Sequence, residues 1–198
     1  MIRWRGYIDQ AKRSGLRMSL AGLCAALILG AMMTSGEAGA ASLEDTLLLE
    51  LKDGPVVIEM RPDLAPGHVA RIKELVRAEF YDGLLFHRVI DGFMAQTGDP
   101  GGDGTGGSGQ KLDAEFSDEA HVRGTVSMAR AQSPNSADSQ FFIVFQDSAW
   151  LNGQYTVWGR VVQGMEHVDA IKRGEGQGGT VSDPDKIVRL RVAADVAE

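Results

Sequence analysis

The residues best equipped for chemistry lie between positions 84 and 99, in the stretch Leu-Leu-Phe-His-Arg-Val-Ile-Asp-Gly-Phe-Met-Ala-Gln-Thr-Gly-Asp. Arg88 stands inside an apolar run, although a guanidinium cannot be deprotonated and is costly to bury without an acceptor. One interpretation is that Arg88 pairs with a carboxylate or extends its charged end to water. The other is that it serves as a permanent hydrogen-bond donor beside an apolar surface. Such a donor could stabilise a lone pair that becomes localised in a transition state.

The more familiar catalytic constellations are missing from the sequence. No serine lies in a Gly-x-Ser-x-Gly elbow, and the single cysteine, Cys24, lies in an apolar N-terminal run. His68, His87, His121 and His167 show no His-x-x-x-His spacing of the kind that binds zinc. We therefore expect neither a hydrolase nor a metalloenzyme, and no metal or cofactor. His87 is expected to be a hydrogen-bonded structural residue.

Residues 98 to 109 contain seven glycines and no apolar side chain, which predicts a loop. The segment Gly104 to Gly109 satisfies the G-x-G-x-x-G pattern of dinucleotide sites, but no helical period follows it, so the pattern carries little weight. A calcium site at Asp99 and Asp103 is an equally weak prediction, because a calcium cage needs more oxygen ligands at defined steps.

The N-terminal segment has the order of a secretory signal peptide. Five basic residues precede an uncharged run of 16 residues, 18 to 33, and small residues follow up to Ala41. We expect cleavage after Ala40 or Ala41, giving a signal peptide over 1–41, with a retained membrane anchor as the alternative. Leu23 precedes Cys24, where a lipoprotein processing site needs a small residue, so we do not expect lipidation. Without this segment the chain has no cysteine, which suits an oxidising periplasm. After cleavage we expect no association with the membrane.

Residues 42–198 form the predicted functional domain, and their length suits one domain with a core. They carry 15 Lys and Arg against 25 Asp and Glu, a net charge of −10. This surplus of acidic residues argues against nucleic acid as a partner and for a soluble, self-repelling surface. We expect the domain to be a monomer.

The apolar patterns predict eight short strands and two helices. Short strands joined mostly by turns favour a closed eight-stranded antiparallel β-barrel, mainly β, capped by two α-helices. The predicted strands are Thr46 to Leu51, Val56 to Met60, Phe86 to Ile90, Phe93 to Thr97, Gly124 to Met128, Phe141 to Phe145, Thr156 to Val162 and Ile187 to Val192, and the predicted helices are Pro62 to Phe80 and Gly164 to Lys172.

Asp91-Gly92 lies between two of these strands and predicts a type I′ hairpin turn. Strict alternation about this turn puts Arg88 and Phe93 on one face and Met94 and Gln96 on the other. A site containing all four needs a bulge or a strong local twist. Phe141 and Phe142 pose a similar question, because adjacent strand residues face opposite sides and the period does not say which side is the core.

The string Phe86-His87-Arg88-Val89-Ile90-x-Gly92-Phe93-Met94-x-Gln96-x-Gly98-Asp99 resembles the signature of the cyclophilins, the cyclosporin-binding peptidyl-prolyl isomerases. The stretches 127–131 and 139–143 are similar to two further blocks of that family, and the resemblance covers Leu47 to Val192. It implies the capped barrel independently of the strand pattern. It also implies an enzyme that accelerates rotation about X-Pro bonds in proline-containing polypeptides.

The resemblance also implies a role for each site residue. Arg88 looks like the catalytic arginine of the family, and Gln96 looks like the glutamine that orients it. Trp150 stands where a tryptophan is associated with cyclosporin binding, so sensitivity to cyclosporin A is implied. The remaining residues that the resemblance assigns to substrate binding are Phe93, Met94, Ala129, Arg130, Gln140, Phe142, Leu151 and Tyr155.

Two of these positions depart from the family pattern. Arg130 stands where many members carry asparagine, and Tyr155 stands where many carry histidine. Both departures bear on sequence preference and rate more than on reaction type. We expect an exported isomerase that assists folding in the periplasm. The alternatives are a non-catalytic proline-binding module or holdase that uses the same groove, and a barrel that binds a sugar or a nucleotide.

Overall fold

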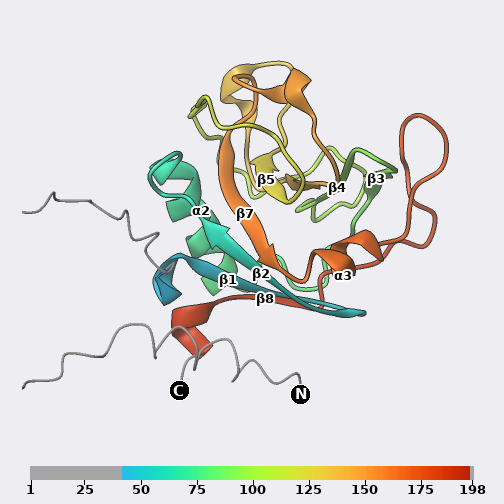
Figure 1. Cartoon of the computed structure of the whole chain (residues 1–198), viewed down its shortest axis with the longest axis horizontal. Helices are drawn as coiled ribbons and strands as arrows, with labels where there is room; N and C mark the ends of the chain where they lie inside the picture. The colour runs from blue at the N-terminus through green and yellow to red at the C-terminus, as the bar shows by residue number, and fades with distance from the viewer. Residues whose placement is uncertain (1–41, 197–198) are drawn as a thin grey trace, which may run out of the picture.

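The computed structural model describes residues 42–196, which form one eight-stranded antiparallel sheet, strongly curled, with two α-helices (Figure 1). The predicted signal peptide lies outside the described residues. The strand order is β3-β4-β6-β5-β7-β2-β1-β8. The strands are β1 (Thr46–Leu51), β2 (Gly54–Met60), β3 (Arg88–Ile90), β4 (Met94–Thr97), β5 (Thr125–Met128), β6 (Phe141–Val144), β7 (Val157–Gln163) and β8 (Arg189–Val192).

All eight predicted strands and both helices are confirmed. Strand β1 has the predicted bounds, β2 begins two residues earlier than predicted, β7 is shifted by one residue, and the other elements are shorter. The helices are α2 (Pro66–Arg77) and α3 (Met165–Asp169), and they lie on either side of the long strand β7 in Figure 1. Four 3₁₀ turns, η1 to η4, span Leu43–Asp45, Pro134–Ser136, Ala149–Leu151 and Ala193–Val196. Among the described residues no helix is long and apolar enough to cross a membrane.

The ends of the sheet do not close by pairing β3 with β8. Residues just before each of these strands meet instead: Gly83 N donates to Ile187 O at 2.8 Å, and Ile187 N donates to Leu84 O at 2.9 Å. The outer edge of β3 is already occupied, because Val89 N donates to Gly179 O and Gly174 N to Val89 O. The fold class is as predicted, but the sheet is a half-barrel whose seam is made by loops.

The core fills the concave side of the sheet. Phe141 lies there with its ring edge against Tyr81, at a centroid distance of 5.5 Å, and against Trp158, at 5.4 Å. Phe142 belongs to a separate cluster with Met94, Val144 and Leu151. The structure therefore places Phe141 inside and Phe142 on the outer face.

The connection between β3 and β4 differs from the predicted turn. Ile90 pairs with Met94, so three residues lie between the strands, and only Gly92 has a positive φ, of 66°. A type I′ turn needs two residues and a positive φ at both. The odd number of residues pairs Arg88 with Gln96 and puts them on one face with Met94, which resolves the conflict that strict alternation produces.

Helix α2 has no side-chain cap from its own N-terminus, since Ala65 stands at the cap position. The Glu115 carboxylate supplies the cap from a distant loop. It accepts the backbone N–H groups of Gly67 at 3.0 Å and of His68 at 2.9 Å. Exposed backbone donors at a helix start favour an anion, so this contact fixes α2 to the loop before β5.

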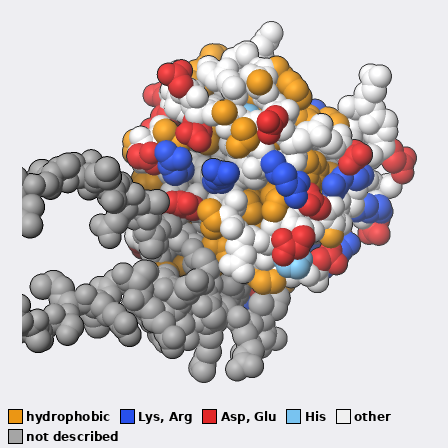
Figure 2. Space-filling view, viewed as in Figure 1, with side chains coloured by type: hydrophobic (Ala, Val, Ile, Leu, Met, Phe, Trp, Pro, Cys, Tyr) orange, Lys and Arg blue, Asp and Glu red, His pale blue; other side chains and the backbone are white. Residues whose placement is uncertain are grey.

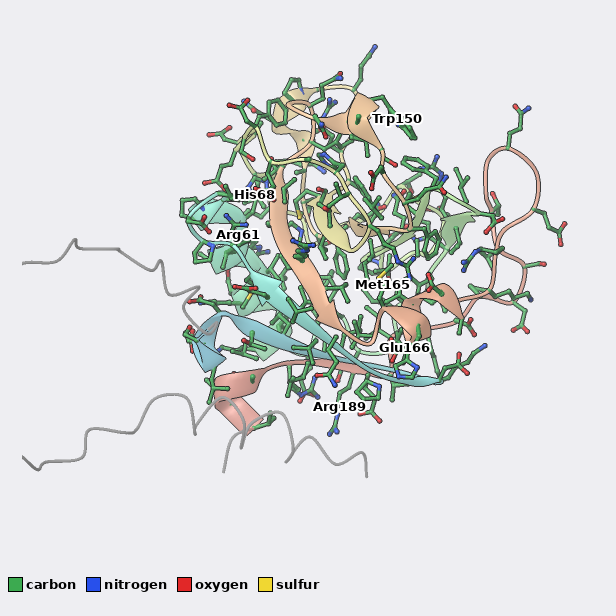
Figure 3. The ribbon with its side chains drawn as sticks, in the orientation of Figure 1. Arg61, His68, Trp150, Met165, Glu166 and Arg189 are labelled. Atoms are coloured by element: carbon green, nitrogen blue, oxygen red, sulfur yellow. The ribbon has the colours of Figure 1, made fainter. Side chains whose placement is uncertain are left out.

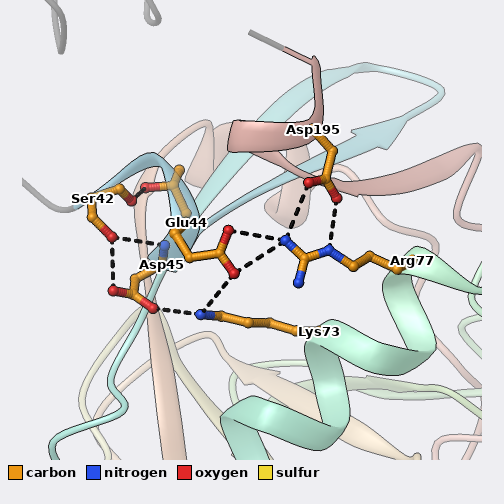
Figure 4. Close-up of polar contacts among 7 residues, drawn as sticks. Ser42, Glu44, Asp45, Lys73, Arg77 and Asp195 are labelled. Atoms are coloured by element: carbon orange, nitrogen blue, oxygen red, sulfur yellow. Dashed lines mark hydrogen bonds and ion pairs between the residues drawn. The ribbon is translucent and has the colours of Figure 1, made fainter.

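Both ends of the described chain are tied to α2 by ion pairs (Figure 4). Lys73 Nζ lies 2.7 Å from Asp45 Oδ1 and 3.4 Å from Glu44 Oε1. Arg77 reaches Glu44 at 2.9 Å and Asp195 at 3.0 Å. The helix therefore links η1 and η4, which flank the first and last strands.

Candidate functional site

A cavity of about 500 Å³ opens on the outer face of the sheet, near β3, β4 and β6. Trp150, at its rim, lies far from Met165 and Glu166 of α3 (Figure 3). Ten of the eleven residues predicted for the site line this cavity, and Gln140 lines a neighbouring cavity of about 140 Å³. The ten are Arg88, Phe93, Met94, Gln96, Ala129, Arg130, Phe142, Trp150, Leu151 and Tyr155.

Two acceptors fix the guanidinium of Arg88. Its Nε donates to Gly178 O at 3.0 Å, and its Nη1 donates to Gln96 Oε1 at 3.1 Å. Among residues 42–196, Nη2 makes no hydrogen bond. Because the Gly178 carbonyl and the Gln96 side chain together fix the guanidinium plane, the remaining N–H groups of Arg88 can donate to a molecule in the cavity.

The glutamines continue this row of hydrogen bonds. Gln96 Nε2 donates to Gln140 Oε1 at 2.9 Å, and Gln140 Nε2 donates to the carbonyls of Gly104 at 3.0 Å and Gly106 at 2.8 Å. Since each amide uses its oxygen as acceptor and its nitrogen as donor, Gln96 Oε1 has to face Arg88. Gln140 thus holds Gln96 in the orientation in which its oxygen accepts from Arg88.

The Asp99 carboxylate holds the glycine loop against this row. Its oxygens accept the backbone N–H groups of Gly101 at 2.8 Å, Asp103 at 3.0 Å and Gly104 at 2.6 Å. Burial raises the pKa of Asp99, but these hydrogen bonds outweigh burial and hold the pKa below its usual value. The N–H groups of Gly101 and Gly104 therefore donate to the Asp99 carboxylate of the protein itself.

Apolar side chains form the opposite wall of the cavity. Phe142, Met94 and Leu151 are buried in the outer cluster, and Tyr155 meets the Phe142 ring edge-on at a centroid distance of 5.8 Å. Phe93 belongs to the three-residue connection between β3 and β4, and its ring centroid lies 5.6 Å from that of Trp150. Most of the Trp150 side chain is exposed, so the wall extends to the surface.

Arg130 is held tightly at the side of the cavity. Its Nε and Nη2 donate to Gln154 O at 3.1 and 3.0 Å, and its Nη1 donates to the carbonyls of Ala131 and Gln132. The guanidinium lies 4.7 Å from the centroid of the Tyr155 ring. The two positions that depart from the family pattern, Arg130 and Tyr155, are therefore stacked on each other.

His87 contradicts the expectation of a hydrogen-bonded structural residue. It is buried in the cavity wall, and neither ring nitrogen has a hydrogen-bond partner among the described residues. Burial lowers the pKa of His87, and the neighbouring Asp99 opposes this effect. Its imidazole is therefore neutral at pH 7.

Sequence reasoning missed the third side of the cavity. Gly102, Asp103, Gly104 and Thr180 line it, and Gly178 supplies the carbonyl that fixes Arg88. The first three lie in the predicted glycine loop. The segment with Gly178 and Thr180 has no strand or helix period, and its only signal is a high content of glycine.

Comparison with known proteins gives consistent results. The family described as cyclophilin type peptidyl-prolyl cis-trans isomerase/CLD matches residues 46–192. A probable peptidyl-prolyl cis-trans isomerase of Brucella suis is 57% identical over 183 residues, which cover 86% of this chain and 92% of the relative. Peptidyl-prolyl cis-trans isomerase B of Bacillus subtilis is 44% identical over 128 residues, covering 63% of this chain and 89% of that protein.

Solved structures agree with the sequence matches. A cyclophilin from Hirschia baltica has a TM-score of 0.70 at 28% identity, covering 78% of this chain and 76% of the other. The structure of a Cryptosporidium parvum cyclophilin type peptidyl-prolyl cis-trans isomerase in the presence of the dipeptide Ala-Pro has a TM-score of 0.69 at 28% identity. The match covers 74% of this chain and 98% of the other. With its outer-face cavity, its curled sheet and these relatives, the chain belongs to the family of cyclophilin-type peptidyl-prolyl cis-trans isomerases.

Proposed function

We propose that the cavity holds an X-Pro segment with the prolyl ring against Phe142, Met94 and Leu151, and that Arg88 donates a hydrogen bond to the prolyl nitrogen as the bond twists. Resonance between the nitrogen lone pair and the carbonyl creates a barrier of about 18–20 kcal/mol. The lone pair becomes localised at the twisted geometry, so a fixed donor stabilises the transition state more than the ground state.

The observation that carries this proposal is the position of Arg88. Its guanidinium lines the same cavity as the apolar wall and is held on two sides by Gly178 O and Gln96 Oε1. An arginine donates and never accepts, which is what a developing lone pair requires. The apolar wall can keep the ring still while the preceding residue rotates.

The other cavity residues have roles in the same proposal. Gln96, held by Gln140, orients Arg88 and meets the peptide backbone. Ala129 and Arg130 bind the residue before proline, and Phe93, Trp150 and Tyr155 surround the ring. Trp150, exposed at the rim, supports the proposal that cyclosporin A competes with peptide for this cavity.

The proposed clients are exported proteins in the periplasm. Uncatalysed isomerisation takes tens of seconds or more and can limit folding. The signal-like order of residues 1–41 supports export, and the negative net charge of residues 42–198 supports work on polypeptides rather than nucleic acid. N-terminal sequencing of the protein from a periplasmic extract tests the compartment. A chain that retains Met1 and stays with the membrane would show an anchored enzyme instead.

An isomerisation assay with Arg88→Ala tests the mechanism. A hydrogen bond to a charged group is worth about 1.5–3 kcal/mol, so kcat should fall roughly 10- to 150-fold while the fold is retained. Arg160→Ala, which removes an exposed arginine from β7, is the matched control and should keep full activity.

Unchanged turnover in Arg88→Ala would exclude the proposed role. Peptide binding by the native protein without any acceleration would favour a non-catalytic binding module or holdase. Competition by cyclosporin A in the same assay tests the proposal for Trp150, and no competition at saturating drug would contradict it.

A further inference from the structure

His121 lies directly behind the apolar wall of the cavity, although it does not line the cavity. Its side chain is buried, and its ring stacks on Phe142 at a centroid distance of 6.4 Å and an interplanar angle of 20°. The ring also meets Tyr155 edge-on at 6.5 Å. A single imidazole therefore supports two of the aromatic side chains that face the substrate.

Hydrogen bonds attach the His121 ring to two different elements. Nδ1 lies 3.1 Å from Asn152 Oδ1, and Nε2 lies 2.9 Å from Ser127 Oγ. Ser127 is on β5 and pairs with Phe142 on β6, while Asn152 ends the turn η3 that carries Trp150 and Leu151. The ring thus links the sheet to the segment that forms the rim of the cavity.

The backbone of His121 holds the same segment. Its N–H donates to Asn152 Oδ1 at 2.9 Å, and its carbonyl accepts from Ser148 N at 2.7 Å. A backbone N–H can only donate, so the Asn152 atom facing His121 has to be the oxygen. Nδ1 then carries the proton, and Nε2 accepts from the Ser127 hydroxyl. The contacts specify one neutral tautomer.

We propose that His121 is a positioning residue for isomerisation, which holds Phe142 and the segment 148–155 in the arrangement that receives the prolyl ring. The inference rests on the proposed function, in which this cavity binds that ring. Burial lowers the pKa of His121, with Asn152 acting in the opposite direction, and this agrees with the neutral tautomer. Among the described residues no charged side chain is hydrogen-bonded to the ring.

A change at His121 should alter KM rather than kcat. A wall that contacts the prolyl ring equally before and during rotation contributes uniform binding, so loosening it raises KM and leaves kcat nearly unchanged. A purely structural role would reduce the folded fraction, which lowers the apparent kcat and leaves KM the same. Arg88 should show the opposite pattern, because its hydrogen bond strengthens only as the bond twists.

The experiment measures kcat and KM for a proline-containing peptide with two variants of the full chain. His121→Phe keeps a ring against Phe142 but removes both side-chain hydrogen bonds, and Asn152→Ala removes the amide partner alone. Loss of one or two neutral hydrogen bonds should raise KM about 3- to 10-fold in both variants, with kcat within about twofold of native. His121→Gln retains a donor and an acceptor and should fall closer to the native KM.

His167→Phe is the matched control, because His167 lies on α3, outside the described cavities, and should leave both constants unchanged. A native KM in both His121→Phe and Asn152→Ala would overturn the inference while Arg88→Ala still loses turnover. If the native protein does not accelerate isomerisation, or if Arg88→Ala keeps full turnover, the proposed function fails and the inference fails with it.

Discussion

Two adjacent phenylalanines show how a single residue's position decides its function. Phe141 and Phe142 are both almost fully buried, but Phe141 packs with Tyr81 and Trp158 in the core, whereas Phe142 faces the outer cavity. The same side chain therefore packs in the core at one position and lines the proposed substrate cavity at the next. Hydrophobicity alone does not separate the two roles.

The pair gives a matched prediction. Phe141→Ala should lower the free energy of unfolding by about 3–5 kcal/mol, because it leaves a cavity in the packed core. Phe142→Ala should lower it less, because that ring borders open space, but should raise KM for a proline-containing peptide roughly tenfold. Denaturant titration and steady-state kinetics on both variants check this, and equal effects on stability and KM would contradict the assignment of faces.

At the scale of elements, the segment Gly174–Val181 acts as a strap along β3. Val89 N donates to Gly179 O at 2.7 Å, Val181 N donates to His87 O at 3.2 Å, and the Gly178 carbonyl fixes Arg88. Gly179 has a φ of 69°, and a Cβ there would lie 2.4 Å from Ile90 Cγ1. The strap reaches Arg88 only because glycine permits this close approach.

Gly179→Ala should therefore displace the strap and weaken the hydrogen bond from Arg88 to Gly178. We expect kcat to fall roughly tenfold, the lower end of the range for a charged hydrogen bond, with little change in KM. Gly176→Ala is the control, because Gly176 also has a positive φ, of 62°, but has nothing within 4 Å of a Cβ. Equal kinetics in the two variants would show that the strap does not position Arg88.

At the scale of the whole molecule, charge determines how stability responds to acid. Basic and acidic side chains are interspersed over the visible surface (Figure 2), and the ion pairs at α2 join the two ends of the described chain. Exposed pairs of this kind contribute up to about 1 kcal/mol each and weaken with salt. Two buried histidines add a dependence on pH, because burial lowers the pKa of His87 and His121 below 6.5.

The direction of this effect follows from proton binding. Below pH 6.5 the unfolded chain takes up protons at both histidines while the folded chain keeps them neutral. The free energy of unfolding therefore decreases as the pH is lowered, until the pH reaches the pKa values of the histidines in the folded protein. The slope is up to about 1.4 kcal/mol per pH unit for each histidine. Above pH 6.5 neither contributes. A second decline should begin below about pH 4, where Asp99 loses its negative charge in the unfolded chain first.

Denaturant titrations at pH 7.5, 6.5 and 5.5 test this expectation. The native protein should lose stability between the last two values, and the double variant His87→Gln, His121→Gln should lose much less. Both should decline alike below pH 4. Parallel curves for the two proteins between pH 6.5 and 5.5 would show that other groups dominate.

The elements and the candidate residues could be predicted from the amino-acid sequence. Strand and helix periods predicted ten elements, all of which are confirmed, although only β1 has the predicted bounds. The periods predict them because they arise from local backbone geometry. The resemblance around Arg88 predicted residues of which all but Gln140 line one cavity, and Gln140 bonds to Gln96 directly behind it. Glycine content correctly predicted the loop at residues 98–109.

The way in which these parts face one another depends on the folded arrangement of the chain. Residues 141–144 are all apolar and all buried, so the sequence shows no alternation of apolar and polar residues that would place Phe142 on the outer face. One extra residue between β3 and β4 brought Arg88 and Gln96 onto one face, and the strap rather than β8 occupied the edge of β3. These outcomes depend on contacts between segments distant in sequence, and a periodic pattern holds no information about such contacts.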